Sequence, residues 1–219
     1  MKKKFLNTLA VIGLTLLVMI GALLMVTKIK SIYVYGEEVL HISEYSGVSR
    51  KVAMENYAYV IDYLNGDEKM KFELPSMDYS EDGAYHFYEV KQLIKLAERV
   101  EVILILILLP TILYLCIKEK EYNFLKISGV SIIVFPVILA VLVSINFEKA
   151  FTIFHKLFFY NDKWIFDPRT DPIIDILPEE FFAFCGIIIL GIIIVTGILM
   201  CILHLIIRKK SNYKYRPVL

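Results

Sequence analysis

Two histidines stand in segments whose composition favours acid–base chemistry. His155 is the single imidazole in the aromatic stretch Phe151–Pro168, which is rich in Phe and also contains Tyr and Trp. His86 is followed three residues later by Glu89, and on a helix this spacing lets the carboxylate hydrogen-bond the ring. An imidazole titrates near neutral pH and is the usual general acid or base in enzymes. The two segments predict proton transfer if the fold brings them together, although the spacing alone is equally compatible with two structural histidines.

Other kinds of chemistry have no pattern to carry them. His41 lies in an irregular segment and His204 near the end of an apolar run, and neither has a supporting partner. The chain has no His-x-x-x-His metal motif, no Gly-x-Ser-x-Gly elbow and no phosphate-binding glycine loop. Its three cysteines all fall inside apolar runs, so the outer loops hold neither a disulfide framework nor a thiolate metal site. We expect no metal, no cofactor, no nucleic acid and no obligate protein partner.

Composition places the chain in the membrane class. It has 219 residues, of which 58% are hydrophobic, and its mean hydropathy is +0.63. Four uncharged runs cover residues 5–27, 102–117, 127–147 and 181–207. A spanning helix needs about 20 residues, because it rises about 1.5 Å per residue through a core about 30 Å thick. Three runs meet this length, and the second does so with the help of Arg99 and Lys118, whose stems extend toward the headgroups.

We predict a mainly α membrane protein with four transmembrane helices and an extracytoplasmic cap built from the two outer loops. The spans are expected at 5–27, 100–117, 127–147 and 181–207, the cap segments at 28–99 and 148–180, the inner loop at 118–126 and the tail at 208–219. The first run is too long for a signal-peptide core and lacks a cleavage site, which predicts a retained anchor. By the positive-inside rule both chain ends lie inside and both large loops outside. The basic residues that set this orientation are Lys2, Lys3, Lys4, Lys118, Lys120, Lys126, Arg208, Lys209, Lys210, Lys214 and Arg216.

The outer loops contain the elements that must position the two histidines. Residues 49–64 have apolar side chains at helical spacing and predict a helix, whereas residues 32–40 predict either a short strand or an interfacial stretch. A further helix should begin at Ser80, whose hydroxyl can cap the free amides, and continue unbroken into the second span. The apolar spacing of residues 151–159 predicts an interfacial or cap-buried helix around the second histidine.

Two blocks of the sequence resemble a known family. They are Tyr-Ser-Glu-Asp-Gly-Ala-Tyr-His-Phe-Tyr-Glu-Val-Lys-Gln-Leu at 79–93 and Phe-His-Lys-Leu-Phe-Phe-Tyr-Asn-Asp-Lys-Trp-Ile-Phe-Asp-Pro at 154–168, continuing to Leu-Pro-Glu-Glu-Phe-Phe at 177–182. With the predicted layout, they resemble the bacterial lipoprotein intramolecular transacylase family. In that family the first histidine is usually followed by Met-x-Asp-Val, whereas this chain has Phe87-Tyr88-Glu89-Val90.

The resemblance implies a reaction on lipoproteins that carry a diacylglyceryl group on an N-terminal cysteine. Such enzymes move the sn-2 acyl chain to the α-amino group of that cysteine and leave a lyso-form lipoprotein. One histidine would take the proton from the attacking amine, and the other would give one to the departing glyceryl oxygen. Direct attack closes a medium-sized ring, so holding the two ends of the substrate together matters. The resemblance also implies a place in the bacterial cytoplasmic membrane, with lipoproteins and membrane lipid as partners.

The predicted site centres on His86 and His155 as catalytic residues, and the sequence leaves open which is the acid. We expect the residues that orient them or bind substrate to be Tyr85, Glu89, Phe151, Phe154, Phe158, Asn161, Asp162, Trp164 and Asp167. Asp162 would orient the second ring as Glu89 would orient the first. Two alternatives stay open: a non-catalytic four-span accessory protein whose cap binds lipid or a partner, and a lipid hydrolase that uses the same histidines with water.

Overall fold

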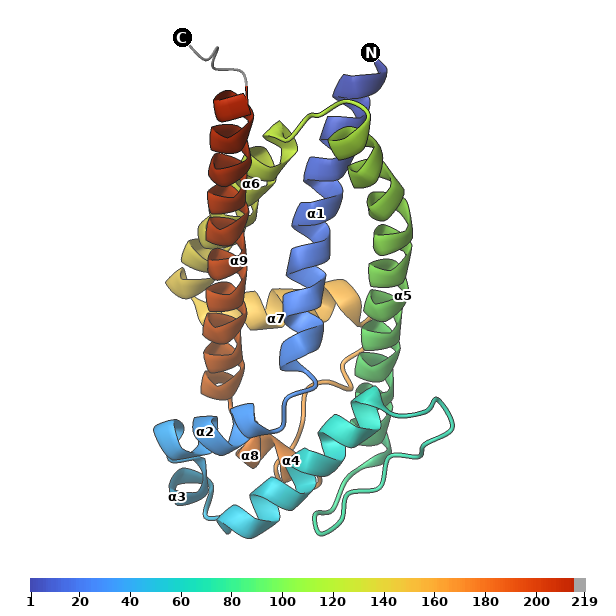
Figure 1. Ribbon diagram of the computed structural model, residues 1–219. Helices are drawn as coiled ribbons and strands as arrows, with labels where there is room; N and C mark the ends of the chain where they lie inside the picture. Colours follow the sequence, from blue (N-terminus) through green and yellow to red (C-terminus); the bar gives the residue numbers. More distant parts are fainter. Residues whose placement is uncertain (215–219) are drawn as a thin grey trace. The chain divides into compact units, whose positions relative to one another are not determined.

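The computed structural model describes the backbone of residues 1–214 and the side chains of residues 1–210, and all regular structure in that range is α-helical (Figure 1). The helices are α1 (Lys2–Val26), α2 (Ser31–Leu40), α3 (Ile42–Ser46), α4 (Arg50–Asn65), α5 (Glu81–Ile117), α6 (Asn123–Ile145), α7 (Phe147–Phe158), α8 (Ile173–Ile176) and α9 (Glu179–Lys214). The chain is therefore mainly α, as predicted. Of the predicted tail at 208–219, residues 215–219 lie outside the described residues.

Four of these helices are long and apolar enough to cross a membrane. They are α1, α5, α6 and residues Glu179–Lys210 of α9. Their number and their place in the chain agree with the four predicted spans. Each helix is longer than its apolar run, because good helix formers and capping residues continue the backbone pattern beyond the uncharged stretch. The longest extension is that of α5, whose apolar part is preceded by two charged turns and the segment that carries His86.

The strand alternative for residues 32–40 is wrong, because this segment forms α2. Its buried side is made of Tyr33, Gly36 and Glu37, a spacing that belongs to one face of a helix. A Cβ on Gly36 would lie 3.0 Å from the ring of Phe181, so the glycine permits a close approach. Apolar and polar residues alternate poorly in this segment because it is a short helix and not a strand.

The chain divides into two compact units, which are described separately. One contains Met1–Leu23, Arg99–Leu142 and the segment from Ile189 onward, and the other contains Leu24–Glu98 and Val143–Ile188. The first unit holds most of the apolar helical length. The second holds both histidine segments that the sequence singled out.

In the first unit α6 and α9 approach each other at two glycines. A Cβ on Gly129 would lie 2.7 Å from the carbonyl oxygen of Gly197, and a Cβ on Gly197 would lie 2.8 Å from that of Gly129. Helices in lipid associate through small residues that let their backbones come close. His204 of α9 is buried in the same unit, and its Nδ1 lies 3.0 Å from the carbonyl oxygen of Tyr122, just before α6.

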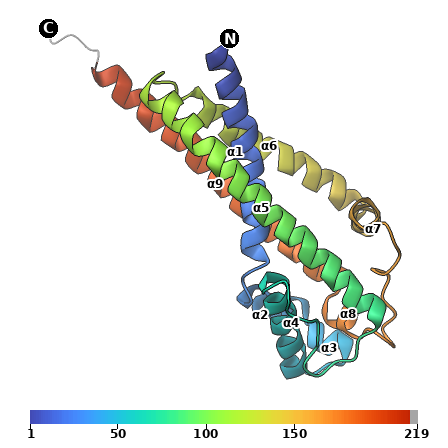
Figure 2. The ribbon, with the colours of Figure 1, turned by 90° about the vertical axis from the view of Figure 1, so that its right-hand side faces the viewer.

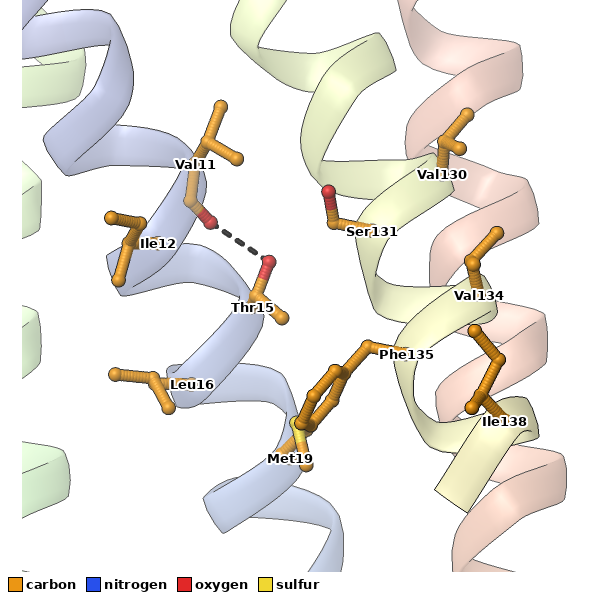
Figure 3. Close-up of a pocket in the computed structure, with 10 residues that line it drawn as sticks. All are labelled: Val11, Ile12, Thr15, Leu16, Met19, Val130, Ser131, Val134, Phe135 and Ile138. Carbon is orange, nitrogen blue, oxygen red and sulfur yellow. Dashed lines mark hydrogen bonds between the residues drawn. The ribbon is translucent and has the colours of Figure 1, made fainter. Parts of the chain in front are cut away.

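The first unit also has an apolar groove between α1 and α6, with a volume of about 570 Å³ (Figure 3). Only two hydroxyls, those of Thr15 and Ser131, interrupt its hydrocarbon lining, and Thr15 donates its proton to the Val11 carbonyl at 2.8 Å. None of the ten residues drawn in Figure 3 is ionisable. The groove therefore lacks the groups that acid–base chemistry requires.

The second unit is built around aromatic contacts. Its helices α2, α3, α4 and α8 pack side by side (Figure 1 and Figure 2). Tyr33 stacks on Tyr57 with ring centroids 4.1 Å apart, and its hydroxyl donates to the Ile176 carbonyl at 2.9 Å. The predicted helix at 49–64 is confirmed as α4, with Ser49 as its N-cap. These contacts make a packed support for the segments that carry the histidines.

Candidate active site

The first turn of α5 sets the position of His86. Ser80 caps the helix as predicted: its hydroxyl accepts a hydrogen bond from the Gly83 amide at 2.9 Å, and its carbonyl accepts one from Ala84 at 2.9 Å. His86 lies in the next turn and is 7% exposed. It precedes the apolar stretch 100–117 of the same helix and lies outside the predicted span.

The helix α7 buries one side chain, that of His155. Asn146 caps the helix by accepting a hydrogen bond from the Lys149 amide at 2.8 Å. His155 is 8% exposed, and its Nδ1 lies 2.8 Å from the carbonyl oxygen of Phe151, one turn earlier. The exposed apolar side chains of the helix are Ile153, Phe154, Leu157 and Phe158. An amphipathic helix with such an exposed face is typical of a membrane interface.

The two imidazoles lie close together inside an aromatic enclosure. Their ring centroids are 5.7 Å apart, and the ring planes meet at 38°. Phe159 lies against both rings, at 4.8 Å from His86 and 5.6 Å from His155. Phe166 meets His86 edge-on at 5.5 Å, and Trp164 stacks on His155 at 4.8 Å. The fold thus brings the two histidine segments together within one unit.

This enclosure keeps both rings uncharged at neutral pH. Burial, and secondarily the charge that His155 can carry, lower the pKa of His86 from its ordinary value of 6.5 to about 4. Burial also lowers the pKa of His155, although the hydrogen bond to Phe151 acts in the opposite direction. Because desolvation penalises the charged form of an imidazole, the neutral form of each ring is favoured at neutral pH.

The hydrogen bond of His155 and the unpartnered Nδ1 of His86 each indicate a tautomer. A carbonyl only accepts, so His155 Nδ1 must donate to Phe151, and the lone pair of the neutral ring is on Nε2. His86 Nδ1 is buried without a hydrogen-bond partner among the described residues. A buried N–H without an acceptor is rarer in proteins than an acceptor without a donor. We therefore place the His86 proton on Nε2, so that one ring offers a lone pair and the other an N–H.

Glu89 is held by the second loop rather than by the His86 ring. The Asn161 amide donates to Glu89 Oε1 at 2.9 Å, and Glu89 Oε2 is buried without a partner among the described residues. The hydrogen bond expected between Glu89 and His86 is therefore not what the structure shows, because Asn161 supplies a competing donor. The orienting contact expected from Asp162 is also absent from the described contacts of His155: Asp162 is exposed, and the neighbouring helical turn supplies the carbonyl acceptor.

The turn after α7 fixes the indole that stacks on the second imidazole. Trp164 Nε1 donates to the Asn161 carbonyl at 3.0 Å, and the side-chain oxygen of Asn161 accepts from the Lys163 amide at 3.0 Å. Lys163 forms an ion pair with Asp82 and stands 4.7 Å above the ring of Tyr85. The predicted residues Tyr85, Asn161 and Trp164 are thus connected to one another through Lys163 and the turn after α7.

Of the remaining predicted residues, three are phenylalanines on or beside the His155 ring, and the fourth, Asp167, is paired with Arg169. Phe151 and Phe154 touch the His155 ring, at 4.2 and 5.5 Å between centroids. Phe158 is exposed and packs on Phe154 at 4.8 Å. Asp167 is engaged by Arg169 at 2.6 Å, and this hydrogen-bonded pair lowers the pKa of the Asp167 carboxyl to about 2. Asp167 therefore braces its own turn.

Three residues at the site were not among those predicted. Phe159 and Phe166 lie within the aromatic stretch, but composition does not tell which rings turn toward an imidazole. Asp171 is 4% exposed and accepts a hydrogen bond from the Ser80 amide at 2.8 Å. The sequence showed Asp171 only as the residue before Pro172. Across the described residues, no group of three His, Cys, Asp or Glu side chains is placed to hold a metal ion.

Together these features define an integral membrane protein with four spans and a buried pair of imidazoles. The model of the family described as lipoprotein intramolecular transacylase Lit matches residues 8–182. The chain belongs to this family. It is an acyltransferase that acts on lipoproteins, and the alternative of a non-catalytic accessory protein is set aside.

Solved structures agree with this assignment. The membrane integral lipoprotein intramolecular transacylase Lit from Bacillus cereus is 32% identical, with a TM-score of 0.91 over 97% of this chain and 98% of that one. Two variants of that protein, with one histidine replaced by arginine or by alanine, give TM-scores of 0.88 and 0.87 at 31% and 32% identity. They cover 97% of this chain in both cases, and 95% and 96% of their own. None of the curated proteins matches the chain significantly.

Proposed function

We propose that this enzyme moves the sn-2 acyl chain of a diacylglyceryl lipoprotein to the α-amino group of its N-terminal cysteine, leaving the lyso-form product. The observation that carries the proposal is the His86–His155 pair, whose centroids are 5.7 Å apart among aromatic rings. We assign both residues to catalysis. Two solved variants of the Bacillus cereus enzyme replace a histidine, which supports looking to histidine for the chemistry.

His155 is the general base. Its Nδ1 is committed to the Phe151 carbonyl at 2.8 Å, which leaves the lone pair of Nε2 for a substrate proton. The lowered pKa of His155 keeps that lone pair free at neutral pH. As the neutral α-amine attacks the ester carbonyl carbon and the C–N bond forms, Nε2 takes the amine proton. A positioned base of this kind contributes roughly 10²–10⁴-fold to a rate.

His86 acts as a hydrogen-bond donor and not as the acid. Its pKa of about 4 keeps the resting ring neutral at neutral pH, so His86 carries no extra proton to deliver to the leaving oxygen. The Nε2–H can instead donate to the oxyanion that forms on the former carbonyl oxygen. A preorganised donor in a site that excludes water is among the larger catalytic contributions available to an enzyme.

The proton returns from the same ring that took it. When the tetrahedral intermediate collapses, the bond from carbon to the glyceryl oxygen breaks, and His155 Nε2–H⁺ protonates the leaving oxygen. The amide and the free glyceryl hydroxyl are then formed, and both histidines regain their starting state. The sequence had suggested one histidine for each proton transfer; the electrostatics favour a single shuttle beside a neutral donor.

The aromatic walls favour transfer over hydrolysis. Direct attack closes an eight-membered ring, which forms reluctantly in solution, and well-oriented groups can gain roughly 7–11 kcal/mol. Phe159, Phe166 and Trp164 lie against the two imidazoles and occupy space that water would otherwise fill. With water displaced, the substrate's own amine is the nucleophile at hand.

The proposal includes the membrane layout. We infer that the spans lie at 5–27, 100–117, 127–147 and 181–207 in the bacterial cytoplasmic membrane, with both chain ends inside. The segments 28–99 and 148–180 then form an outer cap. The amphipathic character of α7 supports this, because its exposed apolar face suits the lipid boundary where a diacylglyceryl group resides.

Purified enzyme and a synthetic diacylglyceryl lipopeptide test the proposal directly. Mass spectrometry of the peptide N-terminus should show an acyl chain on the amine and a free glyceryl hydroxyl, with no change in total mass. The His155→Ala variant should abolish the transfer, as should His155→Phe, which keeps ring volume but removes the base. His41→Ala is the matched control, because His41 is an exposed histidine of the same unit.

The outcomes separate the alternatives. Acyl migration by the purified wild-type enzyme that is lost in the His155 variants supports the proposal. Release of free fatty acid in place of N-acylated peptide favours the hydrolase. Full conversion by both His86→Ala and His155→Ala would remove the histidine pair from the chemistry.

A further inference from the structure

Asp171 is a buried carboxylate that the proposed mechanism does not use. It is 4% exposed, and its Oδ1 accepts a hydrogen bond from the Ser80 amide at 2.8 Å. Its Oδ2 accepts from the Thr170 hydroxyl at 2.7 Å, and its own amide donates to the Asp167 carbonyl at 2.8 Å. Both carboxylate oxygens and the adjoining backbone are therefore held in place.

The carboxylate meets the chain where α5 begins. Ser80 is the N-cap residue, so the bond from its amide to Asp171 fixes the point at which the helix starts. His86 follows six residues later, about 9 Å along the helix axis. Phe166, five residues before Asp171, contacts the His86 ring at 5.5 Å. The Asp171 carboxylate thus connects the helix that carries His86 to the loop whose Phe166 packs against the His86 ring.

Gly83 shows how closely this contact is built. A Cβ on Gly83 would lie 2.1 Å from Asp171 Oδ1 and 3.0 Å from its Cγ. Because Asp171 is buried and bonded through both oxygens, it has little room to give way. The first turn of α5 therefore accommodates the carboxylate only with glycine at this position.

We infer that Asp171 is a positioning residue for acyl transfer, which holds the start of α5 so that His86 is presented to the reacting ester beside His155. The inference rests on the proposed function of the histidine pair. The described contacts of Asp171 include neither imidazole, and Asp171 moves no proton in the proposed reaction. Its effect is on where the His86 N–H points, and a displacement of about 1 Å can cost about 10²-fold in rate.

Three variants address the contact from different sides. Asp171→Ala removes the acceptor and should lower the turnover rate at saturating lipopeptide by about 10- to 100-fold. Asp171→Asn keeps an oxygen that can accept from the Ser80 amide, so this variant should retain most of the wild-type turnover. Gly83→Ala retains the Asp171 carboxylate but pushes it from its position, and should lower turnover to a similar degree.

The double variant distinguishes positioning from general damage. If Gly83→Ala acts by pushing on Asp171, it has nothing to push in an Asp171→Ala background, so the two losses should not add. The double variant should turn over at the rate of Asp171→Ala alone. Asp175→Ala is the matched control, because Asp175 is an exposed carboxylate four residues further along, and it should match wild type.

Turnover, KM and thermal unfolding are measured together. Positioning predicts a fall in kcat with KM nearly unchanged in variants that remain folded. Wild-type turnover per folded molecule in Asp171→Ala or in Gly83→Ala overturns the inference, and so does a double variant whose losses multiply. If Asp171→Ala does not fold, Gly83→Ala and Asp171→Asn still decide the matter. Absence of transfer by wild type would instead count against the proposed function itself.

Discussion

Two buried histidines, His155 of the second unit and His204 of the first, make nearly the same hydrogen bond, and we propose a catalytic role for only the first of them. His155 is 8% exposed and His204 is 5% exposed. Each places Nδ1 at hydrogen-bond distance from a backbone carbonyl, that of Phe151 at 2.8 Å and that of Tyr122 at 3.0 Å. Burial and a satisfied Nδ1 therefore do not distinguish a catalytic candidate from a structural residue.

The difference lies in what each hydrogen bond connects. His204 reaches 82 residues along the chain and joins α9 to the segment before α6, so the bond holds the unit together. His155 bonds one turn back within its own helix, so the bond orients the ring and ties nothing else. The centroid of a second imidazole, His86, lies 5.7 Å away, and the Nε2 of His155 has no hydrogen bond described among residues 1–210. The local bond of His155 is therefore compatible with the proposed catalytic role, whereas the distant bond of His204 indicates a structural one.

Replacing His155 and His204 by alanine should give the largest difference, the first variant losing turnover and the second losing stability. His155→Ala should lower acyl transfer by roughly 10²–10⁴-fold, because it removes the proposed general base. His204→Ala should cost about 1–3 kcal/mol in unfolding free energy, because the Tyr122 carbonyl loses its buried partner. Turnover and thermal unfolding of both variants in detergent check this pair of expectations. Comparable turnover losses per folded molecule in the two variants would break the comparison.

Trp164 provides a smaller effect in the same direction. Its indole stacks on the His155 ring with centroids 4.8 Å apart. Trp164→Ala should lower turnover by about 10-fold, because the ring loses a wall that fixes its orientation and excludes water. Trp164→Phe should keep most of the activity because it retains an aromatic face. Unchanged turnover in Trp164→Ala would show that the Phe side chains alone enclose the ring.

The same tryptophan reports the protonation of its neighbour. Trp164 is the only Trp of the chain, and a protonated imidazole in contact quenches indole fluorescence. Because burial lowers the pKa of His155 from 6.5, the uncharged ring should persist as pH falls, and the fluorescence midpoint should lie below 6.5. The His155→Phe variant should lose this titration, and His204→Gln should keep it. A midpoint above 6.5 would mean that interactions stabilising the charged His155 ring outweigh the effect of burial.

The sequence predicted the elements better than the contacts between them. The four apolar runs and the Ser80 cap depend on local composition, and they were confirmed because length and capping are local properties. The helices α3 and α8 were missed, since helices of 5 and 4 residues carry too few positions to show a period. Residues 32–40 were ambiguous between a strand and an interfacial stretch, and the structure makes them part of the 10-residue helix α2.

The site shows the same division. Composition located the aromatic stretch and its histidine, but the partner of each polar atom depended on residues far apart in the chain. Glu89 was paired with His86 at helical spacing, and the structure pairs it with Asn161, 72 residues away. Asp171 carried no local signal because its partner is Ser80, 91 residues earlier. Such competition among donors is decided by tertiary packing, which a single sequence does not reveal.

A substitution at the α6–α9 contact of the first unit should have the smallest effect on turnover and a clear effect on stability. Gly129→Ala would place a Cβ 2.7 Å from the Gly197 carbonyl oxygen, so α6 and α9 must move apart. We expect a loss of about 1–3 kcal/mol in stability, the usual cost of overpacking, with turnover per folded molecule close to wild type. Gly191→Ala is the control, because a Cβ at Gly191 meets no atom within 4 Å. If Gly129→Ala instead lowered turnover while leaving the unfolding temperature unchanged, the spans would be part of the catalytic machinery. The contrast between a structural first unit and a second unit that carries the proposed site would then fail. Helix packing in the first unit would influence the geometry of the histidine pair in the second.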